Sequence, residues 1–110
     1  MTTVRTEQLV AIADIGFEPV VVLTAATGVL TVITCISAVT GNNALIAYWN
    51  LLHAPSGAKL AGAFHTEGTL DWTQDLLTGR WALEPADTLT FVSDGSAWDL
   101  FITGFTLTLP

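Results

Sequence analysis

The sequence predicts an all-β protein folded as one antiparallel β-sandwich of about seven or eight strands, either jelly-roll-like or Ig-like. Three observations lead to this prediction. Val, Ile, Thr and aromatic residues are frequent, and they favour a pleated, half-buried surface. Gly, Pro, Asn and Asp divide the chain into short pieces. The 110 residues, of which 51% are hydrophobic, suffice for one core, so we expect a single domain over 1–110.

The first elements are three strands. Segment 8–14 alternates between apolar and polar residues, and residues 1–14 are expected to form an N-terminal arm or an extra edge strand. Segment 18–25 is almost continuously apolar, which is typical of a strand covered on both faces. After Thr27 and Gly28, segment 29–39 alternates again. Strict alternation would place Leu30, Val32, Thr34 and Ile36 on one face and Thr31, Ile33, Cys35 and Ser37 on the other.

The middle of the chain predicts a turn at 40–43 and a strand at 44–53. One face of that strand should carry Leu45, Ala47, Trp49 and Leu51. Proline and glycine in 54–57 end the strand. Segment 58–64 is undecided between one helical turn and a loop.

The last third contains three predicted strand regions. Segment 68–74 reads as a strand, and 75–85 contains an expected turn at Thr78 and Gly79. Segment 87–94 leads through a hairpin signal, "DGS", into a strand within 97–109. That final strand should place Trp98, Leu100, Ile102 and Gly104 on one face.

The stretch "EPADTLTF", residues 84–91, is interpreted as the entry into a strand. Pro85 presets the backbone for a turn, and the Asp87 side chain can accept a bond from a nearby backbone amide.

Charge composition excludes several partners. Only 12% of the residues are charged and the net charge is −7, so neutralisation of phosphates cannot drive nucleic-acid binding. The basic residues Arg5, Lys59 and Arg80 are scattered and form no patch for anionic lipid.

Residues 20–39 are uncharged and long enough to span a bilayer. Four threonines, a glycine and an acidic flank at Asp14 and Glu18 favour two strands joined by a turn instead, so a membrane partner is not expected. The N-terminus lacks the pattern of a secretory signal, and synthesis in the cytoplasm is expected.

No motif predicts catalysis, a cofactor or a metal, so the chain is expected not to be an enzyme. The acids available for acid catalysis are Asp71, Asp75, Glu84, Asp87, Asp94 and Asp99. Three of them lie beside turn residues, and acids in such positions are interpreted as turn formers. His53 and His65 lack a third ligand at a recognisable spacing and are interpreted as surface or interface residues. Ser56 lies in a turn where its hydroxyl would bond the backbone. Cys35, the single cysteine, is expected to be a buried, inert thiol.

Four tryptophans are the candidate site residues: Trp49, Trp72, Trp81 and Trp98. Exposed indoles could stack on sugar rings, as in a carbohydrate-binding or host-attachment module. Alternatively they fill the core or anchor a protein interface, which is the favoured interpretation. A domain with this much apolar sequence and few charges also favours assembly with other chains.

Two stretches carry a resemblance. "LTVITCISAVTGNNALIAYWNLLHAPSG" (30–57) and "WALEPADTLTFVSDGSAWDLFITGFTL" (81–107) resemble small β-sandwich virion proteins of tailed bacteriophages. In such proteins a strand ends in a small polar turn, its partner ends in a P-S-G type turn, and a phrase like L-x-x-x-D-T-L introduces the last strands. The likeness covers about residues 28–107 and leaves 1–27 outside it.

The resemblance implies a non-enzymatic structural protein of the virion, located in the head, neck or tail as a decoration or adaptor component. It implies a homo-oligomer, a trimer or ring, in contact with other virion proteins. The tryptophan content adds surface glycan as an alternative partner.

Overall fold

The computed structural model describes residues 6–41, 47–65, 73–94 and 97–109. Within these ranges the chain forms strands and no helix. The strands are β1 Glu7–Ile15, β2 Val20–Thr24, β3 Val29–Thr40, β4 Ala47–Ala54, β5 Lys59–His65, β6 Thr73–Leu83, β7 Thr88–Ser93 and β8 Trp98–Thr108.

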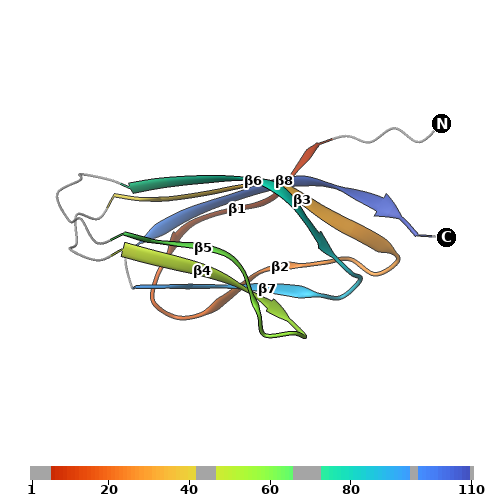
Figure 1. Ribbon diagram of the computed structural model, residues 1–110, viewed down its shortest axis with the longest axis horizontal. Helices are drawn as coiled ribbons and strands as arrows, with labels where there is room; N and C mark the ends of the chain where they lie inside the picture. Colours follow the sequence, from red (N-terminus) through yellow and green to blue (C-terminus); the bar gives the residue numbers. More distant parts are fainter. Residues whose placement is uncertain (1–5, 42–46, 66–72, 95–96, 110) are drawn as a thin grey trace.

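The strands form two stacked antiparallel sheets (Figure 1). Sheet A has the order β1-β8-β3-β6, and sheet B has the order β2-β7-β4-β5. Of the described strands, only β4 and β5 are neighbours both in sequence and in a sheet, while every other connection passes from one sheet to the other. This is the jelly-roll arrangement. The prediction of a β-sandwich is confirmed, in its jelly-roll form.

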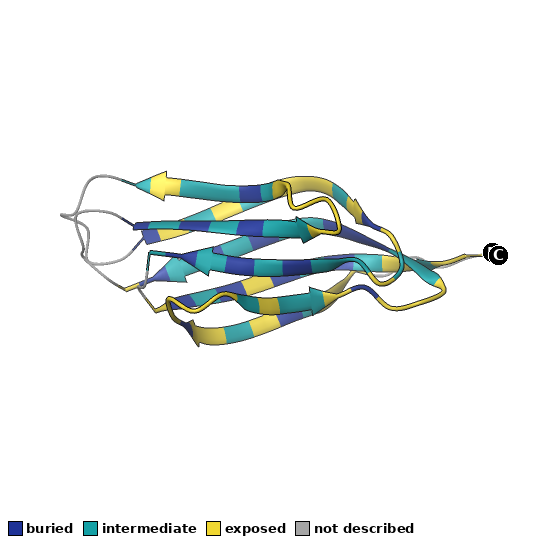
Figure 2. Ribbon diagram, turned by 90° about the horizontal axis from the view of Figure 1, so that it is seen from below, coloured by how far each residue is buried: buried dark blue, intermediate teal, exposed yellow. Residues whose placement is uncertain are grey.

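The core lies between the two sheets. Along the strands buried positions alternate with more exposed ones (Figure 2). At its centre Phe91 stacks on Trp49, with ring centroids 6.0 Å apart, and meets Trp98 edge-on at 6.4 Å. All three side chains are fully buried, so each contributes roughly 1.5–3 kcal/mol or more through removal of apolar surface from water.

The uncharged stretch 20–39 forms β2 and β3, joined by a turn at Gly28, which has a φ of 77°. A left-handed conformation of this kind favours glycine. In the part of the chain that the structure describes, no helix has the length and apolar character needed to cross a membrane.

The expected strict alternation along β3 is wrong beyond Ile33. Ile33 pairs with Gly104 of β8, and Cys35 pairs with the preceding residue, Thr103, so Thr34 is the extra residue of a β-bulge. The bulge changes which residues face the core: Thr31 and Ile33 before it, then Ile36, Ala38 and Thr40 after it.

The bulge also requires a glycine opposite it, at position 104 of β8. A Cβ atom at Gly104 would overlap the carbonyl oxygen of Val32. Glycine at this position therefore permits the close approach of the two backbones.

Two further expectations about strands are wrong. Segment 58–64 lies almost entirely in β5, which pairs with β4 at the edge of sheet B. Thr78 and Gly79 form no turn, because β6 continues through them with a shift in its pairing to β3. The Trp81 ring lies over Gly79, where an added Cβ would approach it to 3.2 Å.

The expected hairpin at 94–96 is also wrong. β7 belongs to sheet B and β8 to sheet A, so this connection crosses between the sheets. Several expected positions lie outside the described residues: 95–96, the second half of the expected turn at 40–43, and the first residues of the expected strands at 44–53 and 68–74.

Candidate functional site

Two of the four candidate tryptophans belong to the core. Trp49 and Trp98 have no exposed surface, so they cannot stack on a sugar. The Trp49 indole N–H donates to Asp75 at 2.8 Å, and that of Trp98 donates to Asp94 at 3.2 Å. Trp81 is half-buried and packs against the core, while Trp72 lies outside the described residues.

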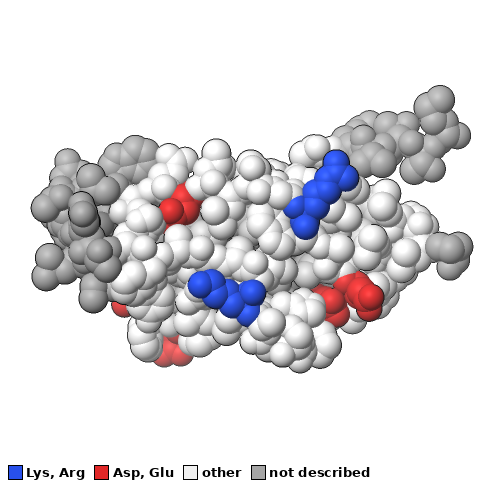
Figure 3. Space-filling view, viewed as in Figure 1, with Lys and Arg blue, Asp and Glu red and all other residues white. Residues whose placement is uncertain are grey.

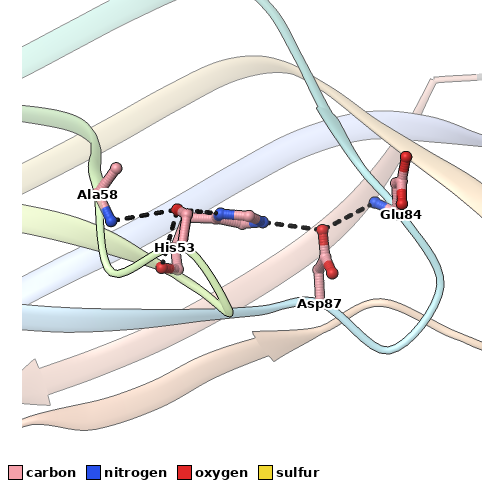
Figure 4. Close-up of polar contacts among 5 residues, drawn as sticks. His53, Ala58, Glu84 and Asp87 are labelled. Atoms are coloured by element: carbon pink, nitrogen blue, oxygen red, sulfur yellow. Dashed lines mark hydrogen bonds and ion pairs between the residues drawn. The ribbon is translucent and has the colours of Figure 1, made fainter.

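A histidine–aspartate pair connects two turns at one end of the sandwich. His53 stands near the end of β4, and Asp87 precedes β7. The Nε2–H of His53 donates to Asp87 Oδ2 at 2.8 Å (Figure 4). On the other side of the ring, Ser56 Oγ lies 2.7 Å from Nδ1 and donates to the His53 carbonyl at 3.4 Å. The three side chains are thus joined in one chain of hydrogen bonds.

The turn that holds Asp87 runs from Glu84 to Asp87. The Asp87 amide donates to the Glu84 carbonyl at 3.1 Å, and the Glu84 amide donates to the Asp87 carboxylate at 3.1 Å. Between them stand Pro85 and Ala86, the latter with a φ of 71°. The prediction that Asp87 bonds the backbone at a strand entry is confirmed.

The same turn also contacts the connection between β2 and β3. The Ala25 amide donates to the Asp87 carbonyl at 2.8 Å, and the Ala86 amide donates to the Ala25 carbonyl at 2.9 Å. Together with the bond from His53, these bonds join three turns: those between β2 and β3, β4 and β5, and β6 and β7. We refer to these three turns as the turn cluster.

Asp87 is electrostatically adapted to this environment. The hydrogen bond from His53 lowers the pKa of the Asp87 carboxyl below its ordinary value, and the bond from the Glu84 amide lowers it further. Sequence reasoning missed this pair, since 34 residues separate its members. A signal was present: each residue adjoins a proline turn, in "HAP" and "EPAD", and successive turns of a sandwich can meet at one end.

Asp87, His53 and Ser56 contact each other in the order found in Ser-His-Asp hydrolases, so their chemistry needs comparison with that site. A hydrolase also requires free amides that bind an oxyanion. Here the Ala58 amide donates to Ser56 Oγ at 3.1 Å, and the Gly57 amide donates to the His53 carbonyl at 2.6 Å. No pocket adjoins these residues in the described parts of the chain. The arrangement supports a role in holding the turns together, as expected for the Ser56 hydroxyl.

A second histidine–aspartate pair joins the two sheets. Nε2 of His65, on β5, lies 2.9 Å from both carboxylate oxygens of Asp75, on β6. The same carboxylate accepts the Trp49 indole N–H, so it satisfies a donor that the core buries. Around these side chains, as elsewhere among the described residues, no group of three ligands could hold a metal ion.

The outward side of sheet A forms a third candidate site. Register places Ala11, Phe101, Ser37 and Leu76 in one row across β1, β8, β3 and β6. Their strand neighbours face the core, so these four face outwards. Phe101 is 47% exposed and Leu76 is 62% exposed, which is unusual for side chains of this size. We call this surface the sheet A outer face.

Cys35 lies on the sheet A outer face, beside that row. It pairs with Thr103 and Thr78 and is half-buried, so the thiol is less buried than expected. Other large apolar residues are exposed elsewhere: Phe17, Val21, Phe64 and Leu109.

Comparison with solved structures finds chains of similar fold. Neither protein-family models nor curated proteins match the chain. The fold is similar to that of Eiger TNF from S. frugiperda, with a TM-score of 0.56 and 14% sequence identity. The similarity covers 94% of this chain and 87% of the other. It supports the β-sandwich assignment and carries no information on activity.

Proposed function

We propose that this chain is a non-enzymatic structural protein of a tailed-phage virion, where it assembles as a homo-oligomer on the head, neck or tail. The observation that carries the proposal is the sheet A outer face, which leaves Phe101 and Leu76 exposed. Large apolar side chains on a well-packed sheet favour contact with another protein.

The polar clusters are consistent with this role. The two histidine–aspartate pairs contact turns, strands and a core indole, and each is occupied in stabilising the sandwich. The face of the molecule seen in Figure 3 is largely uncharged, with a few separated acidic and basic groups. A domain with such a face is suited to packing in an ordered assembly.

The virion assignment rests on the resemblance over residues 28–107, and the jelly-roll topology agrees with it because viral capsid proteins often use this architecture. Lectins also use it, so topology alone does not separate the two roles.

The test is the composition of the particle. Virions of the phage that encodes the chain would be purified by density gradient and analysed by quantitative mass spectrometry and immunogold microscopy. We expect the chain at a fixed copy number per particle and labelling at one location. Its presence in infected cells together with its absence from purified particles would contradict the assignment.

The alternative is a carbohydrate-binding or host-attachment module. Of the four tryptophans, Trp81 is partly exposed. Trp72 lies outside the described residues, and its role in stacking on a sugar stays a prediction. A glycan array, followed by fluorescence titration of the wild type and Trp72→Ala, tests it. Specific binding that the substitution abolishes would favour this function, and absence of binding to host surface polysaccharides would count against it.

A further inference from the structure

We propose that the sheet A outer face binds the same face of a second copy of this chain, in a two-fold symmetric contact. This inference deepens the proposed function, since it rests on homo-oligomeric assembly and names the surface that forms it.

The row across the face has complementary shapes. Phe101 lies between Ala11 and Ser37, and Ser37 in turn lies between Phe101 and Leu76. Large and small side chains therefore alternate across the four strands. When a two-fold axis passes through such a face, the large residue of each copy can occupy the space above the small residue of the other. The surface is complementary to itself.

The charge distribution favours a second copy over an oppositely charged partner. The adjoining rows contain Gln8, Thr103, Cys35 and Thr78 on one side, and Asp99, Val39 and Gln74 on the other. Asp99 is the one acid in these rows, and its carboxylate accepts the Asp14 amide at 3.1 Å.

Two chains that each carry a net charge of −7 repel one another, and the repulsion is smallest where the facing surfaces lack charge. A basic partner, in contrast, would be attracted to the acidic residues outside this face. Because these rows contain a single carboxylate and no basic residue, we infer that a second copy is the occupant.

The area is sufficient. The longest strand of the sheet, β3, has 12 residues. The other three have 9, 11 and 11 residues. At about 3.3 Å per residue and about 4.8 Å between strands, the four strands cover about 680 Å². Stable interfaces bury about 600–1,000 Å² on each partner, and the area of the face lies within that range.

The experiment compares three single variants by sedimentation velocity over a dilution series. Phe101→Glu and Leu76→Glu each place a charge in the row that forms the proposed contact. Phe64→Glu is the matched control, because Phe64 is 61% exposed on the outward side of sheet B. We expect the dissociation constant to rise about 100-fold in the first two variants and to stay within about threefold of wild type in the control.

A second measurement needs no substitution. Cys35 lies within the proposed contact, so a thiol reagent should label it slowly in the wild-type oligomer and at least about tenfold faster after dilution into monomers. This readout remains available if Phe101→Glu fails to fold, which circular dichroism would reveal.

The outcomes separate the two proposals. Loss of assembly in Phe64→Glu with assembly retained in Phe101→Glu and Leu76→Glu would overturn the surface assignment and leave homo-oligomeric assembly intact. Equal labelling of Cys35 in oligomer and monomer would also overturn the assignment. A wild-type chain that stays monomeric at millimolar concentration would overturn both the assignment and the homo-oligomer.

Discussion

Gly104→Ala should destabilise the protein strongly, because Gly104 lies opposite the bulge at Thr34. The added Cβ would overlap the Val32 carbonyl oxygen and lie 2.9 Å from its carbon and 3.0 Å from the Ile33 Cα. Carbon atoms pack best at about 3.5–4.0 Å, so the backbones must separate by roughly 0.5–1 Å. Overpacking of this kind costs about 1–3 kcal/mol. Since the obstacle is backbone, we expect about 3 kcal/mol, or a fall in Tm of about 13 °C.

The assay is urea unfolding followed by tryptophan fluorescence, which reports on the buried indoles of Trp49 and Trp98. Gly16→Ala is the control, because an added Cβ there meets no atom within 4 Å, and its free energy of unfolding should stay within about 0.5 kcal/mol of wild type. A Gly104→Ala protein as stable as this control would refute the close approach of β3 and β8 that we describe.

Three further predictions concern polar groups and turns. Ala86→Gly should raise the free energy of unfolding by about 0.5–1 kcal/mol in urea titrations, since glycine adopts the φ of 71° without the penalty that a Cβ carries; a decrease would contradict the turn geometry. The folded-state pKa of Asp87 is lowered, so its stabilising contribution is complete above the unfolded pKa and is lost as the pH falls through the folded pKa. At pH values below about 4, the urea concentration at the unfolding midpoint of the wild type should therefore decrease, and the decrease should be smaller in Asp87→Asn. An equal decrease in both proteins would exclude Asp87 as its source. Asp75→Ala removes the acceptor of the fully buried Trp49 indole N–H and should cost about 1–3 kcal/mol, and adding Trp49→Phe should produce less than the sum of the two single losses.

The sequence predicted the parts of the fold that depend on local pattern. β2 and β3 follow from β-branched content and a glycine turn, and the inward face of β8 follows from its alternation from Trp98 to Gly104. These features need only the chemistry of neighbouring residues. Topology needs more, because "DGS" is compatible with a hairpin and also with a crossing between sheets.

Features set by distant contacts were missed. β5 contains Lys59, Gly62 and two alanines, which have low strand propensity, and it becomes a strand through pairing with β4. Nothing in the sequence around Thr34 indicates the bulge. Its only counterpart is Gly104, which is 70 residues later in the sequence. The bond between His53 and Asp87 forms only when two turns meet, so no spacing in the sequence encodes it.

The position of β8 has a consequence for how the protein forms. β8 lies between β1 and β3, so the last of the described strands occupies the interior of sheet A. Sheet A therefore cannot be completed until the chain has been synthesised through Thr108. Among the described strands, β1 pairs only with β8, whose residues are more than 80 positions later in the sequence. Pairings of such long range lengthen the search for the native fold, typically to milliseconds or seconds. During that interval the unpaired edges of β1 and β3 are available to other chains, which makes folding, rather than the native state, the stage at which aggregation competes.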